Sequence, residues 1–84
     1  MSEVERRFFY VIRSEEDGRP YTGITWNVAQ RLATHNSGGS VHTVAHRPWR
    51  LAASVEFPTE AAAREFERYL KSGSGRAFAT RHFR

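Results

Sequence analysis

The sequence predicts one small domain of the α/β (α+β) class, with its elements in the order strand, strand, helix, strand, helix (ββαβα). Two strand-like runs joined by turn formers come first, and two helix-like segments with caps flank a third strand-like run. An 84-residue chain has room for a single core. We therefore expect one domain over residues 1–84, with residues 1–6 as a flexible tail.

The first two strands are predicted from composition. Residues 7–13 hold five consecutive apolar or aromatic positions between arginines, which is typical of a central strand covered on both faces. Residues 14–18 are turn formers. The second strand, residues 19–25, contains Pro20 near its start and should therefore begin at a sheet edge, or with the proline nitrogen facing solvent.

The turn length fixes which side chains share a face. If residues 15–18 form the loop, Tyr10 faces Gly23, and Tyr21 lies diagonally across from Tyr10 on the same face. Any loop with an even number of residues keeps both tyrosines together. Gly23 has two readings: it leaves space above Tyr10 for a ligand or another backbone, or it marks a simple bulge.

The first helix is predicted from its caps. Asn27 resembles the first residue of a capping box, with Thr25 as a competing cap, and a Ser-Gly-Gly run should end the helix after about Asn36. Arg31 and His35 are four residues apart, so they share one side of this helix. Both side chains can therefore reach the same object.

Residues 37–49 are expected to form a loop rich in small and basic residues. His42 and His46 have the spacing of a helical zinc pair, but β-branched neighbours and a nearby proline argue against a helix. A loop that contacts phosphate through His42, His46 and Arg47 is the favoured interpretation.

The second half of the chain completes the domain. Residues 50–57 read as the third strand, and Thr59 is the predicted N-cap of a helix that ends at Gly73. The tail after it predicts one more short helix, with Phe78 packed inward.

The composition indicates the class of partner. The formal net charge is +4, and twelve of the thirteen basic residues are arginine, whose planar fork suits phosphate oxygens. A polyanionic partner and an ordinary solvated basic surface explain this charge about equally well. The sequence has no cysteine, no apolar leader in its first seven residues and no membrane-length apolar run, so we expect a soluble, cytoplasmic protein without a membrane partner.

Five residues together resemble the GIY-YIG nuclease family. Tyr10 ends a Phe-Phe-Tyr run that stands for the first motif, and Tyr21 and Gly23 stand at the first and third positions of the second. The tyrosines are eleven positions apart, and Arg31 and His35 follow Tyr21 by ten and fourteen. These spacings match the family pattern, although the motif letters are loose.

Further segments extend the resemblance over nearly the whole chain, as far as the ERYLKSG run at residues 67–73. Helical periodicity leaves Glu65 and Glu67 at opposite margins of the helix's inner stripe, and the resemblance assigns the family's metal-binding carboxylate to Glu67. It also implies a three-stranded antiparallel sheet flanked by helices. Larger family members carry an asparagine near the end of the domain, and this chain has none after Asn36.

The resemblance implies a DNA endonuclease that uses Mg²⁺ or Mn²⁺. Glu67 would anchor the metal ion, and Arg31 would hold the non-bridging phosphate oxygens. Tyr10 would act as general base with Tyr21 orienting water and phosphate, or the two in reverse, and His35 would hydrogen-bond a tyrosine hydroxyl or the phosphate. Branched or damaged DNA is the expected kind of substrate.

Other readings stay open. Each of these residues has an ordinary structural role when taken alone, such as a strand aromatic, a surface arginine or a helix-terminal histidine. A nucleic-acid-binding module that cuts poorly or never is the main alternative, and a protein-interaction domain is the third. The oligomeric state is not predicted. The residues expected to contact nucleic acid are Arg31, His42, His46, Arg47, Lys71 and Arg76.

Overall fold

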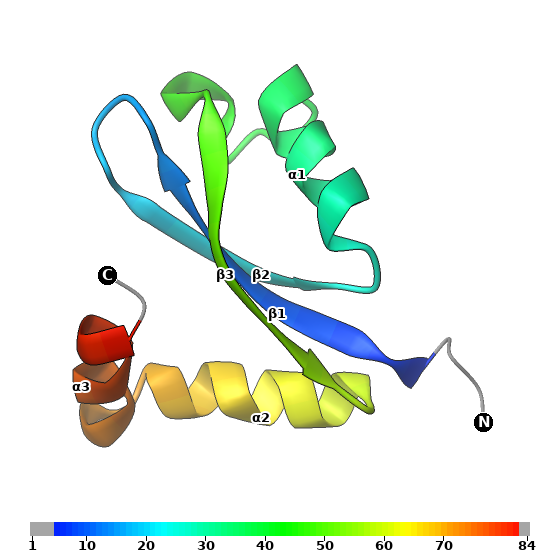
Figure 1. Cartoon of the computed structure of the whole chain (residues 1–84), viewed down its shortest axis with the longest axis vertical. Coiled ribbons are helices and arrows are strands. Elements are labelled where there is room, and N and C mark those ends of the chain that lie inside the picture. The colour runs from blue at the N-terminus through cyan, green and yellow to red at the C-terminus, as the bar shows by residue number, and fades with distance from the viewer. Residues whose placement is uncertain (1–4, 83–84) are drawn as a thin grey trace.

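The computed structural model describes residues 5 to 82 and confirms the expected α+β architecture (Figure 1). Residues 1 to 4 of the expected tail lie outside the described residues. Within the described part, no helix has the length and apolar character needed to cross a bilayer. The elements in chain order are β1 (Arg7–Ser14), β2 (Pro20–Thr25), α1 (Val28–Ser37), the 3-10 turn η2 (Val44–His46), β3 (Trp49–Phe57), α2 (Glu60–Leu70) and α3 (Gly73–His82).

The three strands form one antiparallel sheet in the order β2-β1-β3, so β1 is central and β2 is an edge strand, as expected. The hairpin has the predicted register. Tyr10 pairs with Gly23, Tyr21 pairs with Ile12, and the Ser14 amide donates to the Arg19 carbonyl at 2.9 Å. Both tyrosines therefore lie on the same face of the sheet.

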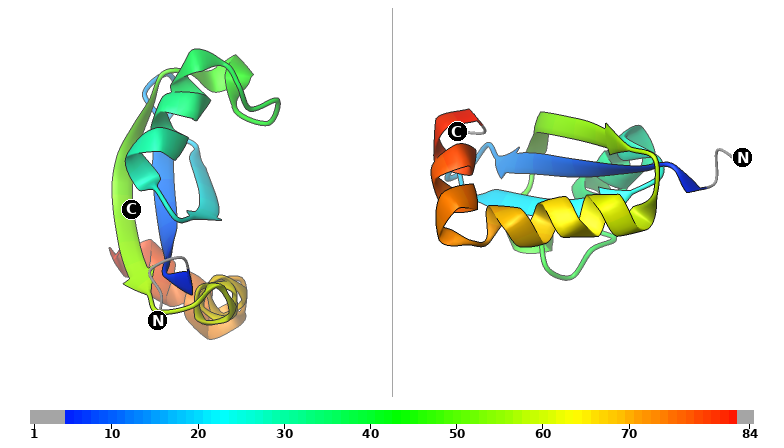
Figure 2. Two further views of the ribbon diagram at one scale, coloured as in Figure 1. Left: turned by 90° about the vertical axis from the view of Figure 1, so that its right-hand side faces the viewer. Right: turned by 90° about the horizontal axis from the view of Figure 1, so that it is seen from below.

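Helices α1 and α2 cover opposite faces of the sheet (Figures 1 and 2). On the α1 face, Tyr10, Ile12 and Trp49 form a buried cluster against which side chains of α1 pack. On the α2 face, the ring of Phe66 lies 5.2 Å from that of Phe9, the strand neighbour of Tyr10. Successive side chains of a strand point to opposite faces, so β1 supplies both cores.

A register shift in β3 decides which of its residues enter each core. Between Val11 and Ile12 the pairing with β3 shifts by one residue, which is a β-bulge. As a result Trp49 pairs with Ser14 and belongs to the α1 face, where it is 4% exposed, while Arg50 stays exposed. Without the shift, Arg50 would face this core in place of Trp49.

The predicted helix caps are confirmed. The Asn27 side chain accepts from the Gln30 amide at 3.0 Å, while Thr25 bonds the Asn27 amide and is not the cap itself. The left-handed Gly38, with φ of 89°, ends α1. Thr59 caps α2 by accepting from the Ala62 amide at 3.1 Å.

The final helix is longer than the sequence predicts. It begins at Gly73, separated by two residues from the end of α2 at Leu70, and this close turn is possible because Gly75 has no side chain and can lie against the Tyr69 carbonyl. Phe78 contacts α2, with its ring 6.2 Å from that of Phe66, but it is 36% exposed and so is not packed inward as expected. The helix α3 thereby covers the end of α2 (Figure 1).

Candidate functional site

Tyr10 fills the space above Gly23. A Cβ built on Gly23 would lie 2.5 Å from the Tyr10 hydroxyl oxygen and 2.7 Å from the Cζ atom of that ring. The space left by the missing side chain of Gly23 is therefore filled by the Tyr10 ring itself, although Gly23 also lines the pocket described below. The simple bulge is wrong, since the pairing of β1 with β2 is continuous there. Residue 23 must be a glycine because the ring of Tyr10, which belongs to β1, lies over the backbone of β2 at this position.

Two residues of α1 meet these tyrosines. The His35 side chain is completely buried, its Nε2 lies 3.0 Å from the Tyr10 hydroxyl, and its ring packs edge-on against Tyr21 at 5.2 Å. Of the two contacts expected of His35, the structure has the one with a tyrosine hydroxyl. Because it has no exposed surface, His35 cannot reach a phosphate. Arg31, one turn earlier, lines the open side of the site.

A buried chain of hydrogen bonds holds the His35 ring at its other nitrogen, the one that does not contact Tyr10. The second ring nitrogen of His35, Nδ1, lies 2.8 Å from the hydroxyl of Thr43, which is also completely buried. The Thr43 carbonyl in turn accepts from the indole nitrogen of Trp49 at 2.9 Å. The Asn36 side chain accepts from the Trp49 amide at 2.6 Å and donates to its carbonyl at 3.0 Å, so the end of α1 is tied to β3.

Burial controls the protonation of this pair. Burial raises the pKa of the Tyr10 hydroxyl above its usual value, and the neighbouring Arg31 guanidinium only partly opposes this. Burial also lowers the pKa of His35, and repulsion from the Arg31 charge lowers that pKa further. Tyr10 is therefore a neutral phenol and His35 a neutral imidazole at pH 7, and neutral imidazole can accept a proton.

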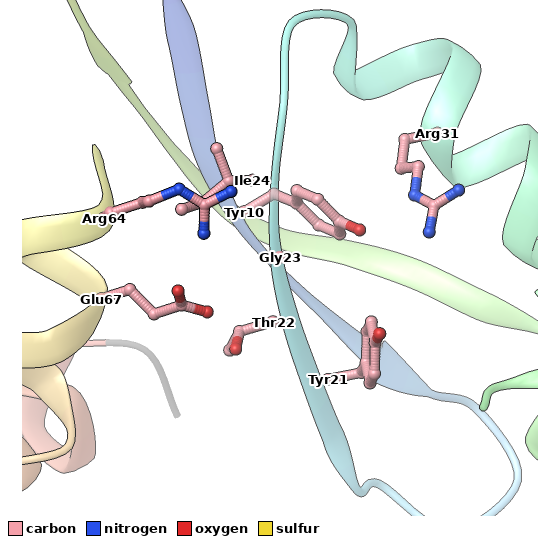
Figure 3. A pocket seen from close by; sticks show the side chains of 8 residues that line it. All are labelled: Tyr10, Tyr21, Thr22, Gly23, Ile24, Arg31, Arg64 and Glu67. Atoms are coloured by element: carbon pink, nitrogen blue, oxygen red, sulfur yellow. The ribbon is translucent and has the colours of Figure 1, made fainter. Parts of the chain in front are cut away.

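The fifth expected residue reaches the site from the other face of the sheet. Glu67 projects from α2 toward the edge strand β2, and Tyr10, Tyr21 and Arg31 approach from the α1 side (Figure 3). A pocket of about 310 Å³ lies over β2. Its lining consists of Tyr10, Tyr21, Thr22, Gly23, Ile24, Arg31, Arg64 and Glu67. Glu65, which helical periodicity could not separate from Glu67, is exposed and does not line the pocket.

The donor set of the pocket suits a hard divalent cation. Among the described residues of its lining, Glu67 is the single carboxylate. Among the side chains that the structure describes, no basic group lies within 4.0 Å of the Glu67 carboxylate, so its oxygens are available for a cation. One carboxylate with water and substrate oxygens is a usual ligand set for Mg²⁺.

The other residues expected to contact nucleic acid lie outside the pocket. His42 and His46 do not share a helix, because residues 41–43 form a turn and Val44–His46 a single 3-10 turn. Arg47 is exposed and donates from Nε to the Val44 carbonyl. Lys71 is the C-cap residue of α2, and Arg76 is exposed on α3.

His46 faces acidic groups of the β1–β2 turn. Its Nδ1 lies 3.6 Å from an Asp17 carboxylate oxygen and 3.9 Å from one of Glu16. Asp17 is already held by Arg19, whose Nε donates to it at 3.0 Å. Two adjacent carboxylates repel phosphate, so this environment disfavours the phosphate contact expected of His46.

Sequence reasoning missed several residues of the site. Arg64 lies three positions before Glu67, and this spacing could have identified it, because residues three apart share a helix face. Thr43, Trp49 and the structural role of Asn36 had no such signal. Thr43 bonds His35, while Trp49 bonds Thr43 and Asn36, and the loop that brings these residues together follows no periodic sequence pattern.

Comparison with known proteins identifies relatives of this chain. The model of the GIY-YIG catalytic domain matches residues 6–81. A UPF0213 protein of Bacillus licheniformis is 40% identical over 70 residues, which is 82% of this chain and 71% of that protein. A UPF0213 protein of Cupriavidus pinatubonensis is 37% identical over 65 residues, covering 76% of this chain and 72% of the relative.

Two further relatives are informative. The human structure-specific endonuclease subunit SLX1 is 37% identical over 71 residues, which cover 73% of this chain and 26% of SLX1. The solution NMR structure of the UPF0213 protein BH0048 from Bacillus halodurans is similar with a TM-score of 0.51 and 31% identity. That similarity covers 89% of this chain and 82% of the BH0048 chain.

Proposed function

Because this chain belongs to the GIY-YIG family, whose relatives include a structure-specific endonuclease subunit, we propose that it is a divalent-metal-dependent endonuclease acting on DNA. The observation that carries the proposal is the convergence of side chains from two strands and two helices on one pocket. Tyr10, Tyr21, Arg31 and Glu67 line this pocket, and His35 lies directly behind it.

Glu67 would hold a Mg²⁺ or Mn²⁺ ion at the α2 side of the pocket. Such an ion supplies charge stabilisation at the phosphate and lowers the pKa of bound water. Arg31 would grip the non-bridging oxygens of the scissile phosphate from the α1 side, where its fork of donors meets two oxygens at once. The two groups face the pocket from opposite sides of β2 (Figure 3).

Tyr10 is the proposed general base, and its contact with His35 is the reason for choosing it over Tyr21. The neutral His35 can take the hydroxyl proton of Tyr10 through Nε2 while Tyr10 takes a proton from the attacking water. The Thr43 hydroxyl has the Ser40 carbonyl as an acceptor at 3.5 Å and can therefore accept from His35 Nδ1. This arrangement leaves Nε2 without a proton, as the transfer needs. Tyr21 would orient the water and phosphate.

Structure-selective DNA is the proposed substrate class. The support is the relationship to a structure-specific endonuclease subunit, together with a pocket that offers cations and hydroxyls for backbone contact. A domain of this size can make few base contacts, so shape and deformability of the DNA would decide preference. His42, Arg47, Lys71 and Arg76 are proposed contacts for DNA backbone beyond the pocket.

A DNA-binding module that does not cut is the second candidate. The observation that favours it is the raised pKa of Tyr10, because a base with a high pKa in a buried site is deprotonated rarely. The basic surface would then serve backbone binding alone.

Nicking assays separate these two candidates. Flap, branched and linear DNA would be incubated with Mg²⁺ or Mn²⁺ and with four variants of the full chain. We expect Arg31→Ala and Glu67→Gln to lose roughly a hundredfold or more in the single-turnover rate. The matched controls Arg50→Ala and Glu65→Gln change exposed residues outside the pocket and should cleave like wild type. Equal cleavage by all variants would indicate a contaminating nuclease and refute the enzyme proposal.

A further inference from the structure

Arg64 is a second arginine of the pocket, on the opposite side of β2 from Arg31. It stands three residues before Glu67 on α2, and both side chains extend toward Thr22 and Ile24 of the edge strand (Figure 3). Residues three apart on a helix share a face. Arg64 and Glu67 therefore approach the pocket together, and a molecule that reaches one also meets the other.

In the structure, Arg64 is held by a carboxylate that a phosphate could replace. Its Nη2 and Nε donate to the same oxygen of Glu60, at 2.6 Å and 3.0 Å. This is the edge of the guanidinium that binds phosphate oxygens. The two side chains are 60% and 46% exposed, and exposed pairs of this kind are weak.

Glu60 is not left without a cation when Arg64 moves. Another oxygen of the same carboxylate lies 3.9 Å from the Arg7 guanidinium. For Arg64 to leave Glu60 and bind a phosphate, the Arg64 side chain needs only to rotate on an exposed surface, while Glu60 keeps Arg7 as a partner. Such rotations are fast and need no movement of the backbone.

We propose that Arg64 binds the DNA phosphate next to the scissile one, so that the pocket holds two successive phosphates of one strand. This inference rests on the proposed function, because the scissile phosphate is placed between Arg31 and Glu67. A strand that crosses β2 over Gly23 passes from the Arg31 side to the Arg64 side. Each guanidinium then pairs with one phosphate, and Glu60 holds Arg64 when DNA is absent.

The test measures DNA binding in EDTA, so that hydrolysis does not contribute. Fluorescein-labelled flap DNA would be titrated with the full chain at several KCl concentrations. We expect Arg64→Ala to raise the Kd about fivefold or more and to reduce the salt slope by about one. Arg64→Lys should recover only part of the affinity, because lysine has no fork of donors. The matched control is Arg50→Ala, which removes the same charge from β3, at the opposite edge of the sheet.

The Glu60 exchange gives a second readout that a purely structural role of Arg64 would not produce. Glu60→Gln should tighten binding about two- to fivefold, and this gain should disappear when Arg64→Ala is also present. Glu56 is an exposed carboxylate that pairs with Arg6, so Glu56→Gln controls for the loss of one negative charge. Its effect should be the same with and without Arg64.

The outcomes distinguish this inference from the proposed function. If Arg64→Ala binds like Arg50→Ala with an unchanged salt slope, or if wild type binds no DNA, the Arg64 inference is overturned. If wild type binds DNA in an Arg64-dependent way but never nicks it with Mg²⁺ or Mn²⁺, the inference holds for a binding module and the nuclease proposal fails.

Discussion

Replacing Gly23 by alanine tests whether the close approach of Tyr10 to β2 builds the site. The new Cβ would lie 2.5, 2.7 and 2.9 Å from three atoms of the Tyr10 side chain, whereas ordinary contacts begin at 3.4 Å. The hydroxyl oxygen would have to move by about 0.9 Å, the difference between 3.4 and 2.5 Å. Tyr10 is only 2% exposed and its hydroxyl is bonded to the buried His35, so this movement has little room.

The expected loss follows from these contacts. Overpacking of this kind costs about 1–3 kcal/mol, and loss of the hydrogen bond to His35 adds about 1 kcal/mol. We therefore expect Gly23→Ala to lower the unfolding free energy by about 2–4 kcal/mol, which in a domain of this size lowers the Tm by roughly 8–32 °C. Nicking activity should fall at a temperature where the variant is still folded, because the phenol is displaced from His35.

Urea unfolding of four proteins measures this effect: wild type, Gly23→Ala, Tyr10→Phe and the double variant. Tyr10→Phe removes the closest atom, so the cost of the alanine should be smaller by about 1 kcal/mol in the double variant. If Gly23→Ala is as stable and as active as wild type, the tyrosine ring does not require the glycine. If the two changes are additive, the Tyr10 hydroxyl does not contribute to the clash.

Three further predictions concern the support of His35 and the metal ion. Thr43→Val should lower the unfolding free energy by about 1–3 kcal/mol, since it leaves a buried ring nitrogen of His35 unpaired, whereas Thr43→Ser should lose less; equal thermal unfolding of the valine variant and wild type would contradict this. The pKa of His35 lies below its ordinary value in the folded chain, so the unfolded chain takes up a proton first as the pH falls. The contribution of neutral His35 to the unfolding free energy is therefore complete above about pH 6.5 and is lost at lower pH. His35→Gln should therefore show a flatter dependence of urea-unfolding free energy between about pH 7 and 5, and parallel curves would refute it. Glu67→Gln should weaken Mn²⁺ binding, measured by electron paramagnetic resonance, about tenfold, while Glu65→Gln should leave the Mn²⁺ affinity unchanged; equal affinities would place the ion elsewhere.

Local rules explain how much of the fold the sequence predicts. The apolar run of β1, the even turn length and the position of Pro20 predict a central strand, an edge strand and two tyrosines on one face, and the structure confirms all three. The caps at Asn27 and Thr59 are likewise confirmed, because a capping bond joins residues three apart. These features depend on residues that are close together in the sequence, so the local sequence pattern is sufficient to predict them.

The candidate site was predicted partly by spacing and partly by resemblance. The spacing of Arg31 and His35 places both on one side of α1, and the structure brings them to the two tyrosines. Periodicity alone could not choose between Glu65 and Glu67, and the resemblance selected the residue that the structure places in the pocket. The catalytic roles of these residues stay predictions.

Features that join distant segments become visible in the folded chain alone. The bulge in β3 selects Trp49 over Arg50 for the core, Thr43 fixes the buried His35, and Gly23 admits the ring of Tyr10. Each is a contact between residues that no periodic pattern relates, so its geometry depends on how loops and sheet register bring two segments together. Local sequence signals predict the strands and the main helices and the faces they present, and the packing of those elements sets what each polar side chain contacts.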